Sequence, residues 1–342
     1  MHNTIYILCP NELVTGGTEA LHQMVDAINK QGGDGRIVYV SRLSVGVKRR
    51  PPFRFRHYEI NVATSVDDTI GNAIVAPEVY PEIMCKYKNA TTYFWWLSFD
   101  YFSNSKVPFP KNVKHICQSY YAADMIKNEG LIVHQMVTDY ITVFPLKARE
   151  SKRNVIMMPT RKIDAAYQSL HDHILAKYST IEIRNLSKLA LSRSFQKSKL
   201  YVDFGIHPGK DRLPREAVYF DAMVLTSKSG SCTNNVDVPL DDQYKITSDI
   251  SVVELDKRID NMFNQETQNS VFKNYKKIIQ NDRQTFFDEI STVFGLTKIV
   301  IGPLESNFRY KYYMYLDHVR SVLRFDERLL KIKKKLSTYL RK

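Results

Sequence analysis

The chain has 342 residues, of which 44% are hydrophobic and 25% charged, an ordinary globular composition at a length that suggests about two domains. This excludes an intrinsically disordered or fibrous chain, and the longest apolar runs fall short of the roughly 18 residues that a membrane-spanning helix needs. The formal net charge is +13, and eleven basic against three acidic residues within 309–342 supply +8 of it. The first 308 residues are therefore only mildly basic.

The N-terminus enters an apolar strand pattern without a basic segment or a small-residue cleavage site, so we expect no secretory signal. The four cysteines, Cys9, Cys85, Cys117 and Cys232, lack CxxC spacing. A set this sparse in a chain of this length predicts reduced, mostly buried thiols in a cytoplasmic protein.

Short apolar runs alternate with amphipathic segments through the first part of the chain. This alternation is typical of parallel strands whose connecting helices cover the sheet. The expected strands of this part cover 5–10, 36–41, 73–77, 91–97 and 113–118. Helices are expected after the first strand, ending near Gly32-Gly33, and over 120–128, closed by Gly130.

A second series of the same kind follows, and we predict two successive α/β sheets with a boundary within 145–153. The expected strands of this series cover 154–158, 181–184, 200–204 and 223–226, and the expected helices cover 165–177, 187–197 and a segment that opens at Pro214. From Val252 onward the pattern is helical. The residues expected to face the core there are Ile278, Phe286, Phe287, Ile290 and Phe294.

The C-terminal tail predicts a basic amphipathic helix. Its apolar residues recur at spacings of four, three, four and four, and they are Phe325, Leu329, Ile332, Leu336 and Leu340. Such a helix can lie on an anionic membrane, or its stripe can pack on the body of the protein. Nucleic-acid binding is not expected, because no nucleic-acid-binding motif accompanies the charge. A second basic cluster, Lys48-Arg49-Arg50 with Arg54 and Arg56, predicts a surface loop.

Gly16-Gly17-Thr18 follows the first expected strand and opens a helix. Backbone N–H groups at a helix N-terminus can bind an anion, and in open α/β sheets ligands bind at the carboxyl edge. The segment lacks the GxGxxG spacing of dinucleotide sites, so a simple glycine turn is the alternative. We take these three residues as a candidate acceptor or phosphate loop.

The segment 201–217 leads from a strand through a glycine-containing loop to Pro214-Arg215-Glu216-Ala217, and a strand and the turn Ser229-Gly230-Ser231 follow. This order resembles the donor-binding signature of GT-B glycosyltransferases. The resemblance implies that Glu216 hydrogen-bonds the donor ribose, and that His207, Gly209 and the Ser229–Ser231 turn belong to the donor site. Retaining members carry a further Glu where this chain has Pro208. From the residues alone, the alternative is that Glu216 is a carboxylate stabilised near a helix N-terminus.

Arg161 and Lys162 close the first strand of the second series. In the GT-B superfamily this position carries an Arg and a Lys that neutralise the nucleotide phosphates, chemistry that a guanidinium fork and an ammonium suit well. We therefore predict that both bind the donor phosphates, with Lys210 and Arg212 as secondary candidates.

Several segments of the first domain resemble bacterial glycosyltransferases of capsule and surface-polysaccharide synthesis. The resemblance as a whole spans roughly residues 5 to 300. The segments that carry it include Pro77-Glu78, Trp95-Trp96, Gln118-Ser119 and Thr138-Asp139-Tyr140. An inverting transferase needs a base for the acceptor hydroxyl. Asp100, at the end of the fourth expected strand, is our first candidate, with a turn or cap role as the alternative. Glu19 and Asp139 are weaker candidates.

These observations predict an α/β protein with a GT-B-like fold, in which two Rossmann-like domains, 1–148 for the acceptor and 149–300 for the nucleotide-sugar donor, precede a basic helical tail over 301–342. The expected function is transfer of a sugar from a nucleotide-sugar donor to a glycan or lipid-linked acceptor, in the synthesis of capsule or lipopolysaccharide. The enzyme would be cytoplasmic and peripheral on the inner face of the membrane, bound through 325–342. No DxD or HExxH motif is present, so no metal or other cofactor is expected.

The sequence leaves two alternatives open. Pro208, in place of a Glu, favours a nucleotide- or carbohydrate-binding protein that keeps the scaffold without the chemistry. The dipeptide His207-Pro208 also occurs in some bacterial sialyl- and Kdo-transferases, and it favours transfer from a CMP-activated acidic sugar, with His207 on the nucleotide phosphate.

Overall fold

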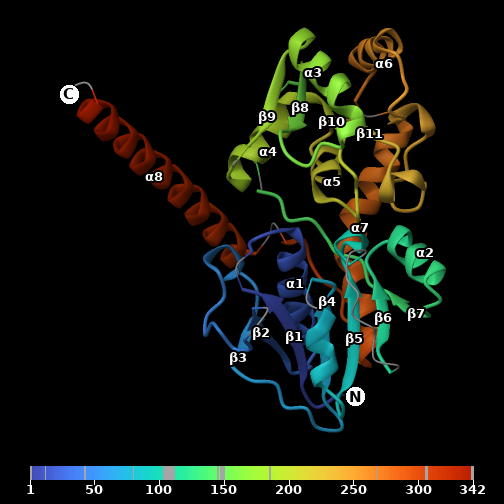
Figure 1. The fold of residues 1–342 in the computed structure, drawn as a ribbon, viewed down its shortest axis with the longest axis vertical. Coiled ribbons are helices and arrows are strands. Elements are labelled where there is room, and N and C mark those ends of the chain that lie inside the picture. The colour runs from blue at the N-terminus through green and yellow to red at the C-terminus, as the bar shows by residue number, and fades with distance from the viewer. Residues whose placement is uncertain are drawn as a thin grey trace.

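The computed structural model describes residues 2–11, 13–41, 44–79, 81–102, 112–144, 146, 151–184, 186–267, 269–304 and 307–339, and it describes no side chains at 101 or beyond 323. Two sheets built from parallel ladders form its centre (Figure 1). The first has the strand order β3-β2-β1-β4-β5-β6-β7. Its strands are β1 Ile5–Pro10, β2 Gly35–Val40, β3 Asn61–Ala63, β4 Ala73–Pro77, β5 Thr91–Trp96, β6 Lys114–Cys117 and β7 Val133–Met136.

The second sheet has the order β12-β11-β10-β8-β9. Its strands are β8 Arg153–Pro159, β9 Thr180–Ile183, β10 Ser198–Asp203, β11 Met223–Ser227 and β12 Lys245–Ile246. The sequence did not predict β3, β7 and β12. All three are short strands at a sheet edge, and an edge strand lacks the continuous apolar run that marks a strand buried between two neighbours.

Helices cover the sheets, as the alternating pattern predicts. They are α1 Gly16–Lys30, α2 Tyr120–Asn128, α3 Gln168–Lys177, α4 Lys188–Lys197, α5 Arg212–Tyr219, α6 Val252–Asn264, α7 Ser270–Phe294 and α8 Phe308–Tyr339. Because both faces of the first sheet are covered, consecutive strand residues are buried in different cores. Trp95 packs in the core with α1, and Trp96 packs in the core with α2, both fully buried.

Helix α7 passes from one domain to the other (Figure 1). Near its start, Phe272 and Ile279 are buried in the core of the second domain, whereas Phe286 and Ile290 are buried in the core of the first. The prediction that Ile278 faces the core is wrong, because its side chain is 47% exposed. The buried face of the helix runs through the next residue, Ile279, at the spacing of Phe272 and Phe286.

Helix α8 starts against the first domain and then extends away from the body of the protein (Figure 1). Tyr310 and Met314, in its first turns, are buried in the core of the first domain. The apolar stripe predicted over 325–340 lies outside the described side chains. Within the part of the chain that the structure describes, no helix is long and apolar enough to cross a membrane. All four cysteines are free, and Cys85 alone among them is exposed.

Candidate functional site

The carboxyl ends of the strands in the two sheets meet across the domain interface. Phe99, after β5, donates its backbone N–H to the carbonyl of Pro208 at 3.2 Å. Lys210 donates its backbone N–H to Oε1 of Gln118 at 3.1 Å. A Cβ added to Gly209 would lie 2.2 Å from the Leu97 carbonyl oxygen, so glycine permits this close approach. The predicted donor loop therefore faces the carboxyl edge of the first sheet, where ligands bind in such folds.

Two residues beside this edge adopt left-handed backbone conformations, Lys162 with φ 63° and His207 with φ 52°. Neither is a glycine, so each conformation costs about 1–3 kcal/mol, and such strain clusters at functional sites. The loops that carry them are neighbours, because Ile163 and Gly205 form an isolated antiparallel bridge. Arg161 and Lys162 are both exposed here, at the end of β8.

The predicted turn Ser229-Gly230-Ser231 lies against the predicted donor loop, residues 205–211, and holds it through hydrogen bonds. Ser231 donates its backbone N–H to the His207 carbonyl at 2.8 Å and its hydroxyl to the Gly209 carbonyl at 2.7 Å. Ser229 donates its hydroxyl to the Gly205 carbonyl at 2.9 Å. Gly230 has φ 50°, and a Cβ there would lie 2.0 Å from the His207 carbonyl oxygen. The turn thus holds the shape of the loop.

The ring of His207 lies in the interior, with Nδ1 2.8 Å from Oδ2 of Asp211. Burial acts to lower the pKa of His207, but Cys232, Asp203 and Asp211 together raise it well above its ordinary value. The contact between Nδ1 of His207 and Oδ2 of Asp211 ties the two ends of the loop together. Contact of this ring with a donor phosphate remains a prediction.

Arg212, on the first turn of α5, joins the second domain to the first. Its Nη1 lies 2.6 Å from Oε2 of Glu19, and its Nη2 lies 2.8 Å from Oδ2 of Asp139 and 3.1 Å from Oε1 of Gln23. Although burial acts to raise the pKa of Glu19, Arg212 and neighbouring cations lower it to about 2. The pKa of Asp139 is also lowered. Carboxylates so firmly ionised are weak proton acceptors, which disfavours both as the catalytic base.

Arg212 also occupies the space beside the predicted phosphate loop. A Cβ added to Gly16 would lie 3.0 Å from Cδ of Arg212. Thr15 and Thr18 form a reciprocal capping box at the start of α1, so the Thr18 hydroxyl contributes to the helix cap. The structure therefore brings the glycine loop together with a cation of the second domain.

Further ion pairs extend the same interface. Arg215 is fully buried, with Nη2 2.5 Å from Oδ1 of Asp139 and Nη1 3.3 Å from Oδ2 of Asp282. Lys210 places Nζ 3.1 Å from Oδ1 of Asp282 and donates to the Thr138 hydroxyl at 3.1 Å. Because Asp139 belongs to the first domain and Asp282 to the bridging helix α7, these pairs fix the second domain against both.

Glu216 lies on α5 and is buried, with Oε1 2.5 Å from Nζ of Lys188 on α4. The ammonium balances the charge of the carboxylate and holds its direction. The sequence did not suggest Lys188, because its partner lies on another helix. The predicted contact of Glu216 with a ribose remains a prediction.

Asp100 lies in the turn after β5, half-buried, and its Oδ1 accepts a hydrogen bond from the Tyr121 hydroxyl at 3.1 Å. Burial, with Asp100 beside it, raises the pKa of Tyr121 to about 12. The predicted base therefore lies at the carboxyl edge of the first sheet, where the sequence placed it.

Glu78 is a second carboxylate at this edge. The sequence analysis named it within a resembling segment but predicted no role for it. It follows β4, is buried, and its Oε2 accepts the Leu97 N–H at 3.0 Å. Burial raises the pKa of Glu78 to about 7, which suits a general base at neutral pH. The available signal was its place directly after a wholly apolar strand.

Asp237 is a further interface residue that the sequence did not suggest. Its two carboxylate oxygens each accept a backbone N–H at the start of α2, from Tyr120 and Tyr121, both at 2.8 Å. The second domain thus caps a helix of the first. Among the described residues, no group of three or more His, Cys, Asp or Glu could hold a metal ion, and the absence of a metal requirement remains a prediction.

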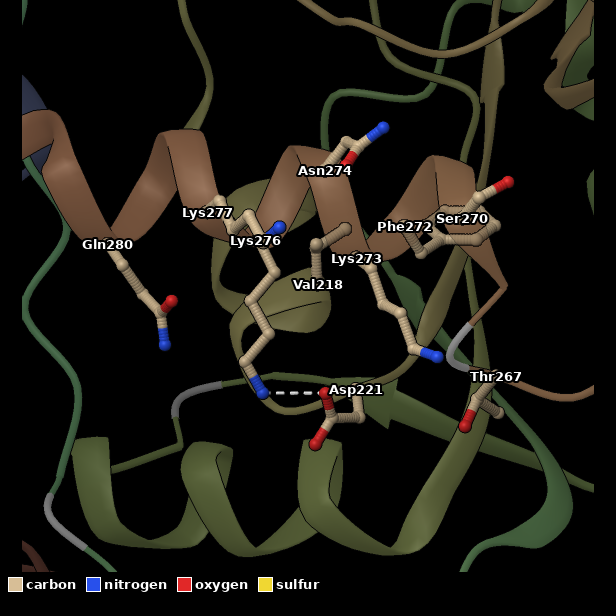
Figure 2. Close-up of a pocket in the computed structure, with 10 residues that line it drawn as sticks. All are labelled: Val218, Asp221, Thr267, Ser270, Phe272, Lys273, Asn274, Lys276, Lys277 and Gln280. Atoms are coloured by element: carbon tan, nitrogen blue, oxygen red, sulfur yellow. Dashed lines mark hydrogen bonds and ion pairs between the residues drawn. The ribbon is translucent and has the colours of Figure 1, made fainter.

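A separate cavity of about 390 Å³ lies at the other end of α5, against the first turns of α7 (Figure 2). Lys276 crosses it to pair with Asp221 at 2.6 Å, and Lys273 and Lys277 also line it. The cavity lies at the C-terminal end of α5, whereas Arg212 and the loops described above lie at its N-terminal end.

No protein-family model matches this chain, and no curated protein matches it. Among solved structures, sucrose-phosphate synthase from Thermosynechococcus elongatus superposes with a TM-score of 0.54 at 10% identity, over 86% of this chain and 98% of that one. The catalytic domain of starch synthase IV from Arabidopsis thaliana, bound to ADP and acarbose, gives 0.50 at 8% identity, over 86% and 99%. The DNA-modifying enzyme beta-glucosyltransferase gives 0.50 at 12% identity, over 86% and 100%.

At these identities the likeness establishes the fold. The chain has the GT-B-like arrangement of two Rossmann-like domains with a C-terminal helix, and the predicted fold class is confirmed. The predicted division at 148/149 falls among residues outside the described part of the chain and remains a prediction.

Proposed function

We propose that this protein is a glycosyltransferase that moves a sugar from a nucleotide-sugar donor to a glycan acceptor. One observation carries the proposal: the strained loops around Lys162 and His207 lie side by side, and the His207 loop meets the ends of β5 and β6. This is the position at which such a fold binds its ligand. Starch synthase IV binds ADP and beta-glucosyltransferase uses uridine diphosphoglucose, which supports a nucleotide-linked donor.

In this proposal the exposed Arg161 and Lys162 bind the donor phosphates, and Glu216 binds the ribose hydroxyls. The ion pair with Lys188 supports the latter role, because it orients the carboxylate before the donor arrives. Lys210 and Arg212, the secondary candidates, are paired with Asp282 and with Glu19 and Asp139, and in this proposal they hold the loop in place beside the phosphates. Gly209 and the turn Ser229–Ser231 shape the loop that receives the donor.

The chemistry proposed is direct displacement at the anomeric carbon. The acceptor oxygen forms the new bond as the nucleotide leaves, and a carboxylate accepts the hydroxyl proton. Asp100 is the first candidate for this base, and the pKa of Glu78, about 7, makes it the second. This route gives inversion, in keeping with Pro208 where retaining members carry a Glu.

The finer assignment is a bacterial enzyme of capsule, lipopolysaccharide or other surface-polysaccharide synthesis, with a lipid-linked or cell-surface acceptor. We propose a cytoplasmic location on the inner face of the membrane, bound through the basic segment 325–342. The first-domain segments resembling such enzymes and the net charge of +8 within 309–342 support this assignment.

A non-catalytic nucleotide-binding protein is the second candidate. The observation in its favour is that the Pro208 carbonyl accepts the Phe99 N–H, so the loop position that carries a catalytic-site Glu in retaining members serves here to join the domains. Transfer from a CMP-activated acidic sugar is the alternative within the enzyme class, and it rests on His207-Pro208.

Thermal stabilisation by UDP, GDP, dTDP, ADP and CMP tests the donor site, because a ligand at 100 times its Kd adds about 2.7 kcal/mol to the folded state. We expect one nucleotide to stabilise the parent and to lose that effect in Glu216→Ala. Hydrolysis of the matching nucleotide-sugar without acceptor then separates an enzyme from a binder. Stabilisation by no nucleotide would refute the donor site, and stabilisation without hydrolysis or transfer would favour the binder.

A further inference from the structure

The first half of α8 carries a row of large apolar side chains that face solvent. We call this row the outer stripe, and it consists of Phe308, Tyr312, Tyr315, Val322 and Leu323, which are between 45% and 80% exposed. At about 100° per residue, all five lie within an arc of about 100° on one side of the helix. The rings of Phe308 and Tyr312 stack along this side with centroids 6.4 Å apart.

The outer stripe is exposed although the helix itself is held in place. On the other side of the helix, Tyr310 is buried and donates its hydroxyl to the Val143 carbonyl. Further along, the Arg320 guanidinium lies 4.1 Å from the ring centroid of Phe53, and His318 Nδ1 lies 3.0 Å from the Ser187 hydroxyl. These contacts fix the rotation of the helix, so the outer stripe faces away from the body.

Basic residues accompany the outer stripe. Lys311 is exposed beside the outer stripe, and Arg309 and Arg320 are exposed on the flank that contacts Arg56 and Phe53, against one acidic residue, Asp317. The sequence continues with eight basic and two acidic residues over 324–342. An apolar face with this excess of cations is the pattern of a helix that lies in the surface of an anionic bilayer.

We propose that the outer stripe docks on an anionic lipid surface, with α8 parallel to the membrane plane and its cations at the level of the headgroups. The apolar and aromatic side chains then leave water for the boundary of the acyl chains, and Tyr312 and Tyr315 keep their hydroxyls at the polar interface. The contact begins at Phe308, upstream of the segment 325–342.

The charge distinguishes this partner from two others. If two copies paired through their outer stripes, the cations of one helix would lie against those of the other, and like charges repel. A nucleic acid would neutralise the cations but leave the apolar side chains in water. An anionic bilayer removes the apolar side chains from water and also neutralises the cations.

The first turns of α8 are anchored in the first domain, and this bears on which acceptor the protein could use. Because Tyr310 and Met314 are buried in the core of the first domain, a docked helix holds that domain at the lipid surface. If the chain is the transferase proposed above, on which this step alone rests, its acceptor is carried by a lipid. Docking itself does not depend on the transfer reaction.

The test is co-sedimentation of the full chain with phosphatidylcholine vesicles that contain none or 30% phosphatidylglycerol. We expect binding to the anionic vesicles only. Tyr315→Gln with Leu323→Gln, which leaves the charge unchanged, should lower the fraction bound at least tenfold. The matched control is Val253→Gln on α6, a site 75% exposed, and it should bind as the parent does.

Equal binding by the double variant and the parent would overturn the proposal, as would binding by neither. A dimer of the parent, or its complex with duplex DNA, that is lost in the same double variant while vesicle binding is retained would assign the outer stripe to another partner and overturn it too. Thermal unfolding and nucleotide stabilisation should be the same in the double variant and the parent. If no nucleotide stabilises the parent but vesicle binding behaves as expected, the transferase proposal fails and the docking proposal stands.

Discussion

Arg212 and Glu19 form a buried ion pair, 2.6 Å between Nη1 and Oε2, that joins the first turn of α5 to α1 across the domain interface. The two residues are 193 positions apart in the chain. Three cations and three carboxylates form this largely buried interface set, and they are Lys210, Arg212, Arg215, Glu19, Asp139 and Asp282. The positive and negative charges of this set compensate one another. The positions of the paired groups define how the two domains sit relative to each other.

Removing Arg212 should destabilise the protein strongly. In Arg212→Ala, Glu19 loses its cation and Asp139 keeps only Arg215, and breaking a buried pair from one side costs about 3–5 kcal/mol. Urea unfolding measures the loss. The control Arg36→Ala, which breaks the exposed pair with Asp34, should cost less than about 1 kcal/mol. Similar losses in both variants would contradict the structural role of the interface pair.

The low pKa of Glu19 predicts loss of stability in acid. Its pKa falls from 4.5 to about 2 on folding, so its ionised form stabilises the folded state fully above pH 4.5, and this contribution declines as the pH falls from 4.5 to 2. Glu19→Gln should be less stable than the parent at pH 6 and should lose less stability over that acid window. Urea unfolding at several pH values checks both, and parallel curves would refute the assignment.

Asp100→Asn should lower kcat by a factor of about 10² to 10⁴ if Asp100 is the base, with donor binding unchanged. The measurement is transfer kinetics alongside nucleotide stabilisation. Tyr121→Phe, which removes the hydroxyl bonded to Asp100, is the matched control for positioning and should have a smaller effect. An unchanged kcat in Asp100→Asn would exclude Asp100 and leave Glu78.

Glu78 makes a distinct prediction through its pKa of about 7. If Glu78 is the base, it must be ionised to act, so kcat should rise as the pH increases through about 7. Glu78→Gln should abolish this rise, while Asp100→Asn should leave it in place. A pH profile that is the same in Glu78→Gln and the parent would rule Glu78 out.

Gly209→Ala should separate the donor loop from the first domain. The new Cβ would fall 2.2 Å from the Leu97 carbonyl oxygen, and backbone must move to relieve the clash. We expect a loss of stability of about 1–3 kcal/mol, the usual range for overpacking, together with weaker nucleotide stabilisation. Gly302→Ala is the matched control, because nothing lies within 4 Å of its Cβ position, and an equal effect there would refute the steric explanation.

The sequence by itself determined the two parallel sheets, their connecting helices and most of the core. These follow from local periodicity, since an alternation of apolar strands and amphipathic helices has few compact solutions. Prediction from apolar periodicity failed where a strand was too short to show a pattern, and where the predicted buried position was off by one residue. The edge strands β3, β7 and β12 carry too few buried residues to form a pattern, and Ile278 lies one position off the buried face of α7.

Part of the candidate site could also be predicted from the local pattern of strands. Asp100 follows β5 of the first sheet, and Lys162 and the His207 loop follow β8 and β10 of the second, so strand order alone places each at the carboxyl edge of its own sheet. The tertiary structure alone decided the rest. It gave Arg212 its partners on the first domain, placed Lys188 beside Glu216, and buried Glu78 so that its pKa rises. Charge pairing and desolvation depend on groups that meet only when the domains dock, and no local pattern records which distant residues will meet.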